Sequence, residues 1–281
     1  MKLKEIIEYL EHFAPPAWQE DWDNAGLQIG DIEKNIKKIV LALDADERAL
    51  RFCIDNKADL LITHHPLIFS GIKTVRYHYP EEKILADYIK NDIAVYSMHT
   101  NIDKVPWGTN FALAAELELE TSILEEPLFP EFDHSFKHLT AEFKAQFQQK
   151  ITGFVSLAKV DLSRFELYKR CKEYFEANVN VNFEVDKRVN NLAISGGSFD
   201  KDWIDKLYYS GIDTLLTGEM KYHERVLCRE RDIAVIELGH DISENPVIES
   251  FDYLLKTLRN SKEESSDLEI IKFDRMNYKI I

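Results

Sequence analysis

Hydrophobic residues recur along the first part of the chain with two periods, one typical of helices and one of buried strands. In residues 3–13 they fall three and four positions apart, which predicts an amphipathic helix that ends before Pro15 and Pro16. Residues 38–44, K-I-V-L-A-L-D, are instead continuously apolar, as expected for a strand covered on both faces. The chain therefore begins with a surface helix followed by a buried strand.

The same alternation continues toward residue 117. We expect further helices over 46–56, 81–91 and 109–117, with strands over 59–63 and 93–98. Strands that alternate with helices of this length indicate right-handed crossovers and a largely parallel sheet.

The pattern changes from about residue 125, where Pro127 and Pro130 suggest a crossing between two lobes. Residues 179–185, V-N-V-N-F-E-V, alternate between apolar and polar, which indicates a strand with one wetted face. The run S-G-G-S at 195–198 favours a tight glycine turn before a helix. The remaining expected elements are a helix over 162–175 and strands over 154–158, 192–195, 215–217, 233–237 and 269–273.

These elements predict an α/β fold of two linked α/β lobes. We expect residues 1–124 and 238–281 to form the first lobe, with a mainly parallel sheet, helices packed on it and the candidate metal ligands. Residues 125–237 then form a second, more antiparallel lobe that is inserted in the first.

Composition and charge narrow the classes of function. The 35 Lys and Arg residues against 50 Asp and Glu give a formal net charge of −15, which disfavours nonspecific binding to nucleic acid or an anionic membrane. No apolar run approaches the roughly 20 residues of a membrane-spanning helix. The three cysteines form no CxxC pair, so we expect buried, reduced thiols in a cytoplasmic protein.

The first candidate site is the pair His64 and His65, which ends the predicted strand L-L-I-T and is followed by Pro66. Ligands bind at the carboxyl ends of strands in open α/β sheets. Because successive side chains of an extended chain point in opposite directions, each imidazole could serve one of two neighbouring metal ions. The alternative is two core histidines that bond to backbone groups.

Two further motifs follow predicted strands in the same way. H-T-N-I-D places His99 and Asp103 in one loop, although Asp103 could simply cap a helix. G-H-D-I-S-E places His240 beside Glu244, and we expect Ser243 to cap a helix whose N-terminus favours the Glu244 carboxylate. A capping cluster without metal is the alternative here.

The joint placement of the three motifs favours metal binding over capping. Mixed nitrogen and oxygen donors suit Zn, Fe, Mn or Ni better than Ca or Mg. We therefore expect two divalent metal ions per chain, held by His64, His65, Asp103, His240 and Glu244.

The catalytic residues are not identified by any motif, and the candidates are proton carriers. Glu219 and His223 are spaced to share one helix face and could move a proton or orient a ligand, although a surface pair fits equally well. His99 is a third candidate. In D-W-D-N at 21–24, Trp22 could line a pocket or belong to the core.

Several of these segments together resemble the family of GTP cyclohydrolase 1 type 2 homologues, also called the Nif-three-like proteins. They are L-L-I-T-H-H-P-L-I-F, H-T-N-I-D, T-G-E-M-K-Y-H, G-H-D-I-S-E and the early D-W-D-N-A-G-L-Q-I-G. The resemblance covers residues 1 to about 120 and 190 to 250. It implies two α/β lobes, a dinuclear site formed by the same five residues, and a toroidal homohexamer.

Two functions remain open from the sequence. A metal-dependent hydrolase would use the ions to lower the pKa of water and to stabilise developing charge, acting on a nucleotide-like or phosphoester substrate. The family label points to a GTP cyclohydrolase-like reaction. The alternative is a non-catalytic metal-binding ring that acts as a regulator, metal carrier or assembly platform.

Overall fold

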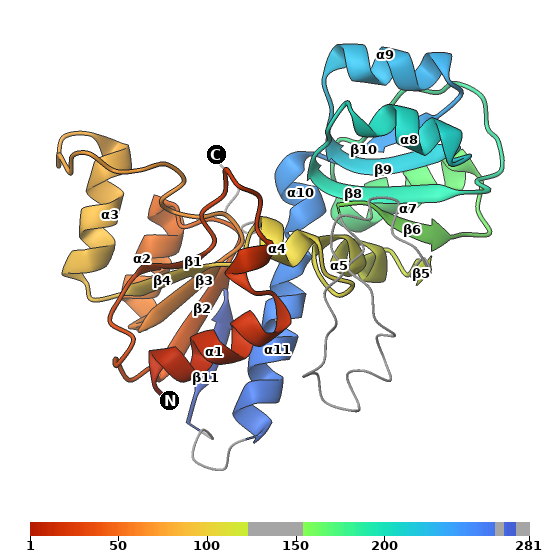
Figure 1. The fold of residues 1–281 in the computed structure, drawn as a ribbon. Coiled ribbons are helices and arrows are strands. Elements are labelled where there is room, and N and C mark those ends of the chain that lie inside the picture. Colours follow the sequence, from red (N-terminus) through yellow and green to blue (C-terminus); the bar gives the residue numbers. More distant parts are fainter. Residues whose placement is uncertain (123–153, 262–266, 274–281) are drawn as a thin grey trace. The chain divides into compact units, whose positions relative to one another are not determined.

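The computed structural model describes residues 1–122, 154–261 and 267–273. The chain forms two compact units (Figure 1). Unit 1 consists of Met1–Ile102 and Ile248–Ile281, and unit 2 of Asp103–Val247. The predicted crossing at Pro127 and Pro130 lies outside the described residues.

Unit 1 is built on a five-stranded sheet in the order β1-β4-β3-β2-β11. The four strands from β4 to β11 pair in parallel, and β1 joins β4 as an antiparallel edge strand. The strands are β1 (Gly26–Ile29), β2 (Lys38–Ala42), β3 (Leu60–Thr63), β4 (Ala94–Ser97) and β11 (Glu269–Lys272). The helices are α1 (Leu3–Phe13), the short 3-10 helix η1 (Pro16–Trp18), α2 (Glu47–Asn56), α3 (Pro80–Lys90), α4 (Thr100–Asp103) and α11 (Val247–Ser261), of which α4 and α11 run across the division between the units.

Both faces of the central strands in unit 1 are buried, as their continuously apolar sequences predict. On one face Val40 and Leu61 pack in one cluster with Leu50 and Cys53 of α2 and Tyr88 of α3. Residues of the opposite parity in β2 and β3 are also fully buried, because side chains alternate across a strand. The prediction of strands covered on both faces is therefore confirmed, and the parallel pairs of β2, β3, β4 and β11 confirm the mainly parallel sheet.

Unit 2 is built on a six-stranded sheet in the order β5-β6-β8-β9-β10-β7. Only β8, β9 and β10 pair in parallel, so this sheet is the more antiparallel of the two, as predicted. Its strands are β5 (Glu120–Ser122), β6 (Ser156–Lys159), β7 (Asn180–Val181), β8 (Leu192–Ser198), β9 (Thr214–Glu219) and β10 (Ala234–Glu237). Its helices are α5 (Thr109–Glu116), α7 (Arg164–Phe175), α8 (Trp203–Tyr209), α9 (Tyr222–Glu230) and α10 (His240–Glu244).

The structure divides the chain at residues 103 and 247, whereas the boundaries expected from the sequence lie near 125 and 237. The reason is packing. Leu113 and Leu117 of the α5 region share a core cluster with Leu192 of β8, so α5 belongs to unit 2. As a result Asp103, His240 and Glu244 are part of unit 2 and not of the first lobe.

Two local expectations also change. The strand predicted over 179–185 is paired only at Asn180–Val181. Beyond it the Asn182 amide still donates to the Val235 carbonyl at 3.4 Å, and the Asn182 side chain makes two further bonds to the backbone in and beside β10. Asn182 Oδ1 accepts from the Val235 amide at 2.7 Å, and its Nδ2 donates to the Ile233 carbonyl at 3.0 Å. The S-G-G-S run at 195–198 lies inside β8 at an irregularity of the β8–β9 register rather than in a turn before a helix.

In the described part of the chain, no helix is both long and apolar enough to cross a membrane. The three cysteines are free and buried, as expected of apolar fillers.

Candidate metal centre

The two adjacent histidines lie just beyond β3, which ends at Thr63. Their ring centroids are 4.9 Å apart, so the side chains lie near each other and do not point to opposite faces as predicted. The chain bends here, and Thr63 Oγ1 donates a hydrogen bond to the His65 carbonyl at 2.8 Å. Leaving the extended conformation removes the alternation on which the prediction rested.

The hydrogen bonds of these histidines define which ring nitrogen faces the site. His64 Nδ1 lies 2.9 Å from the Met98 carbonyl oxygen, and His65 Nδ1 lies 2.8 Å from Asp44 Oδ1. A carbonyl oxygen can only accept, so Nδ1 of His64 carries the proton and its Nε2 carries the lone pair. The Asp44 carboxylate, when ionised, can also only accept, so it keeps the proton of His65 on Nδ1 and leaves the lone pair on Nε2.

His99 joins these two histidines within unit 1. Its ring centroid lies 5.2 Å from that of His64 and 5.6 Å from that of His65. Each of the three residues offers one ligand atom such that all three atoms lie within 4.8 Å of one another. His99 belonged to the H-T-N-I-D motif but was left out of the five expected ligands and was named as a candidate proton carrier. Its position after the neighbouring strand β4 places it in this cluster.

Asp23 holds His99 in place and is a site residue that the sequence analysis did not identify. Its side chain is fully buried, and its Oδ1 lies 2.7 Å from His99 Nδ1. It also accepts hydrogen bonds from the Thr100 amide and hydroxyl and from the Asn24 amide. Burial raises the pKa of Asp23, but the hydrogen bonds from His99 and Thr100 outweigh it and lower the pKa to about 2.

In unit 2 a second set of candidate ligands lies at α10, the short helix that follows β10. His240 Nδ1 lies 3.0 Å from Glu219 Oε1, and His240 Nε2 lies 3.0 Å from Glu244 Oε2. The Glu244 side chain is 6% exposed, whereas that of His240 is 35% exposed. The structure thus brings His240 and Glu244 together, as predicted.

Glu244 is not at a helix N-terminus as expected, because α10 already begins at His240. Ser243 lies inside α10 and does not cap a following helix. Its hydroxyl donates to the His240 carbonyl at 2.8 Å and accepts from the Gly197 amide at 2.9 Å. The hydroxyl therefore ties α10 to β8.

Two glycines allow α10 to approach the sheet so closely. A methyl group on Gly197, which has a φ of +66°, would collide with the Glu244 carboxylate. A methyl group on Gly218 would collide with the Gly197 carbonyl and the Ser243 hydroxyl. The glycines of the S-G-G-S and T-G-E segments thus make room for a buried carboxylate, which is a different role for S-G-G-S from the tight turn that the sequence favoured.

The remaining predicted residues have different surroundings. Asp103 ends α4, and its Oδ1 accepts a hydrogen bond from Thr109 Oγ1 within unit 2. Glu219 belongs to β9 and bonds to His240, so the helix face that it was expected to share with His223 does not exist. His223 is exposed near the start of α9 and stacks edge-on with Tyr222.

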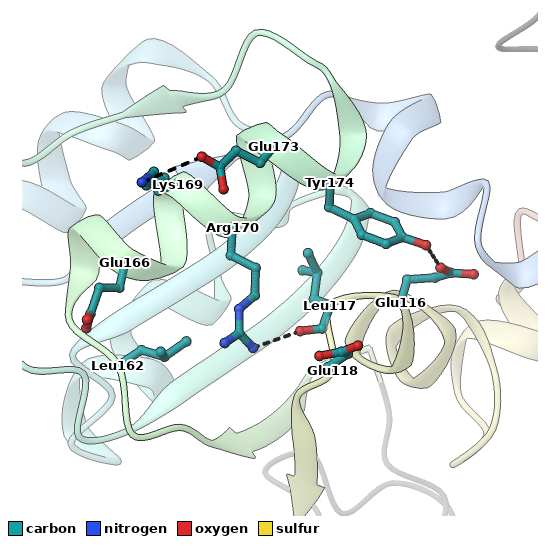
Figure 2. Close-up of a pocket in the computed structure, with 9 residues that line it drawn as sticks. All are labelled: Glu116, Leu117, Glu118, Leu162, Glu166, Lys169, Arg170, Glu173 and Tyr174. Carbon is teal, nitrogen blue, oxygen red and sulfur yellow. Dashed lines mark hydrogen bonds and ion pairs between the residues drawn. The ribbon is translucent and has the colours of Figure 1, made fainter.

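A cavity of about 600 Å³ in unit 2 contains none of the candidate ligands (Figure 2). Arg170 donates to the Leu117 carbonyl at 3.1 Å, and Lys169 pairs with Glu173 at 3.7 Å across the surface of α7. Glu116 accepts a hydrogen bond from Tyr174, as Figure 2 shows, so several of the polar groups that line the cavity bond to one another. The cavity is lined by Glu116, Leu117, Glu118, Leu162, Glu166, Lys169, Arg170, Glu173 and Tyr174.

Comparisons with known proteins identify a family for the chain. The model of the Duf34/NIF3 (NGG1p interacting factor 3) family matches residues 1–277. A protein of Clostridium perfringens named GTP cyclohydrolase 1 type 2 homolog is 30% identical over 272 residues, which cover 96% of this chain and 95% of that protein. A protein of the same name from Methanocaldococcus jannaschii is 32% identical over 276 residues, which cover 98% of this chain and 100% of that protein.

Solved structures show the same fold. The crystal structure of Staphylococcus aureus protein SA1388 matches with a TM-score of 0.82 at 24% identity, covering 100% of this chain and 98% of that one. Reduced HcgD from Methanocaldococcus jannaschii matches with a TM-score of 0.71 at 30% identity, covering 98% of both chains.

Proposed function

Because the chain belongs to the Duf34/NIF3 family and holds its candidate ligands in preset orientations, we propose that it is a metal-dependent hydrolase with two divalent metal ions per chain. The proposed ligands are the five residues identified from the sequence. They are His64 and His65 in unit 1, and Asp103, His240 and Glu244 in unit 2.

One observation carries this proposal. Each of the four histidines, His64, His65, His99 and His240, has its Nδ1 within 3.0 Å of an oxygen acceptor. Metal-binding histidines almost always have the second ring nitrogen bonded in this way, which fixes the tautomer and raises the basicity of Nε2. Four histidines with this arrangement are hard to explain by capping or core packing.

The donor set fits first-row divalent ions. It combines imidazole nitrogens with carboxylate oxygens, which suits Zn, Fe, Mn or Ni. His240 Nε2 and Glu244 Oε2 are 3.0 Å apart, a spacing at which both atoms can reach one ion. The near-complete burial of the Glu244 carboxylate also favours a cation nearby, because burying a negative charge is costly unless positive charge and hydrogen bonds compensate it.

When bound, the ions would supply Lewis-acid activation of water and of the substrate. The chain's own residues supply the rest. Asp23, Asp44 and Glu219 orient the imidazole rings, and Gly197 and Gly218 admit Glu244 to the site. His99 is held by Asp23 beside the adjacent histidines, where it could carry a proton or serve as an additional ligand.

The names of the relatives guide the choice of substrate. Proteins about 30% identical to this chain are named GTP cyclohydrolase 1 type 2 homolog. We therefore place a nucleotide-like or phosphoester substrate first. We also propose a toroidal homohexamer, which light scattering would detect as a particle of six 32.8 kDa chains.

The test combines elemental analysis with a substrate screen. The purified protein, loaded with Mn, Zn, Fe or Ni, should contain two ions per chain and hydrolyse GTP or a member of a phosphoester panel. His64→Ala and His240→Ala should each lower metal content and abolish turnover. His78→Ala, at an exposed position outside the candidate ligand set, should change neither quantity.

Each outcome of this test has a definite meaning. Wild-type protein that binds no metal from any of the four ions overturns the proposal as a whole. Full metal content without turnover on any substrate overturns the hydrolase and leaves the metal-binding ring. Turnover that survives His64→Ala and His240→Ala would show that the activity does not depend on these ligands.

A further inference from the structure

The segment D-W-D-N-A-G-L-Q, residues 21–28, contributes no proposed metal ligand but places an aromatic side chain at the surface. Trp22 is 57% exposed and is therefore not the core residue that one interpretation of the sequence allowed. Phe69, on the loop after the adjacent histidines, is 51% exposed. The two ring centroids are 5.8 Å apart.

The aromatic pair directly adjoins the histidine cluster of unit 1. The Trp22 ring centroid is 6.0 Å and the Phe69 ring centroid 6.3 Å from that of His99, both edge to face. The His99 side chain itself is only 14% exposed. Trp22 and Phe69 thus expose ring surface to solvent, and both rings contact His99. The His99 ring in turn lies beside those of His64 and His65.

Both aromatic side chains stand on loops that are held by specific hydrogen bonds. Next to Trp22, the buried Asp23 carboxylate is bonded to His99 and Thr100. Next to Phe69, the Ile68 carbonyl accepts from Asn24 Nδ2 at 2.6 Å, and the Ile68 amide donates to Gln28 Oε1 at 3.2 Å. The motif residues therefore link the two loops to each other.

Such fixed, exposed aromatic surface beside polar site residues is characteristic of a binding position. We propose that Trp22 and Phe69 form a stacking platform for a planar heteroaromatic ring of the substrate, such as a nucleobase. Every base has a π-face, so a platform of this kind accepts the ring without reading its edges. The inference rests on the proposed function for the reaction itself, but the stacking contact can be measured without turnover.

The experiment compares ligands that differ only in the planar ring. Isothermal titration with metal-loaded protein would measure GMP, AMP, UMP and ribose 5-phosphate, all of which carry the same phosphate. At least one nucleotide should bind more tightly than ribose 5-phosphate. Trp22→Ser should weaken that nucleotide roughly 5- to 150-fold, with little effect on ribose 5-phosphate.

Two variants serve as matched controls. Trp22→Phe keeps an aromatic face and should retain most of the preference for the nucleotide. Tyr209→Ser removes an aromatic side chain that is 83% exposed in unit 2, and it should change nothing. Elemental analysis of every variant shows whether the metal content has stayed at the wild-type value.

The results separate this inference from the proposed function. If no nucleotide binds better than ribose 5-phosphate, or if Trp22→Ser weakens all four ligands equally at full metal content, the platform is refuted while metal binding stands. If Trp22→Ser changes the oligomeric state in light scattering, the aromatic pair is a subunit contact and the platform is again refuted. If the wild-type protein holds no metal, the proposed function fails whatever the stacking result.

Discussion

Replacing Asp23 by Asn tests how the histidine cluster of unit 1 is held. The substitution keeps the size of the side chain and removes its charge. The amide oxygen of the new side chain could still accept one hydrogen bond, but its NH₂ group would face a donor, either His99 Nδ1 or the Thr100 hydroxyl. A fully buried position would then hold donors without acceptors.

The magnitude follows from the pKa and from the contacts. The folded protein lowers the pKa of Asp23 from 3.8 to about 2, which corresponds to about 2.5 kcal/mol in favour of the carboxylate. Donors left unsatisfied in a buried site cost a similar amount. We expect Asp23→Asn to lower the free energy of unfolding by about 2 to 4 kcal/mol in metal-free protein at neutral pH.

The sign of the pH dependence is fixed by the lowered pKa. The contribution of the Asp23 carboxylate is complete above its unfolded pKa near 3.8 and is lost as the pH falls toward 2. The difference in unfolding free energy between the wild type and Asp23→Asn should therefore stay constant between about pH 5 and pH 8, and shrink below about pH 4.

Urea unfolding of both proteins measures the difference, and nitrogen-15 NMR of the imidazoles reports the tautomer of His99. Asp55→Asn, at an exposed position of α2, is the matched control and should stay within about 0.5 kcal/mol of the wild type. An Asp23→Asn protein as stable as that control, with the His99 tautomer unchanged, would refute the role assigned to this carboxylate.

Three further outcomes are expected. Gly197→Ala should lower metal content and destabilise the protein by about 1 to 3 kcal/mol more than Gly211→Ala, since both glycines have a positive φ but only Gly197 faces the Glu244 carboxylate. Removing the ions with EDTA should lower the Tm, and restoring them should return it, because ligands that bind the folded state stabilise it. At pH 8, Ellman's reagent should react slowly with the native protein, because burial raises the pKa to about 12 for Cys53 and Cys171 and to about 11 for Cys228. In denaturant the same reagent should detect all three thiols.

Much of the fold could be predicted because local pattern and packing agree. The helix expected over 3–13 is α1 (Leu3–Phe13), and the apolar run at 38–44 contains β2 (Lys38–Ala42). The division between the compact units does not coincide with the boundary expected near 125, and packing gives the reason. Pro127 and Pro130 mark a local change in composition, whereas the division between units depends on which sheet α5 packs against.

The expected pairing of Glu219 with His223 failed in a related way. A spacing of four residues puts two side chains on one face only if both lie in the same helix. Here β9 runs through Glu219, and α9 begins at Tyr222. Gly218 lets β9 continue to Glu219, because a side chain at position 218 would collide with Gly197 and Ser243. That requirement comes from β8 and α10, which the local sequence does not reveal.

The candidate ligands were proposed from motifs, but the groups that orient their side chains depend on strand register. Thr63 of β3 pairs with Ala42 of β2 and with Ser97 of β4. Asp44, His65 and His99 each lie two residues further along. His65 Nδ1 is 2.8 Å from Asp44 Oδ1, and the ring centroids of His65 and His99 are 5.6 Å apart.

The backbone bonds show that this register continues past the named strands. The His65 amide donates to the Leu43 carbonyl at 3.0 Å, and the Met98 amide donates to the Thr63 carbonyl at 2.9 Å. One residue beyond Thr63, the register therefore places His64 beside Met98, whose carbonyl oxygen accepts from His64 Nδ1. In both pairs the candidate ligand and its acceptor follow their strands by the same number of residues, so the parallel register places them side by side. A sequence analysis that fixes the pairing of β2, β3 and β4 would predict Asp44 and Met98 as the orienting groups, but Asp23 reaches His99 from a loop outside that register and becomes visible only in the folded chain.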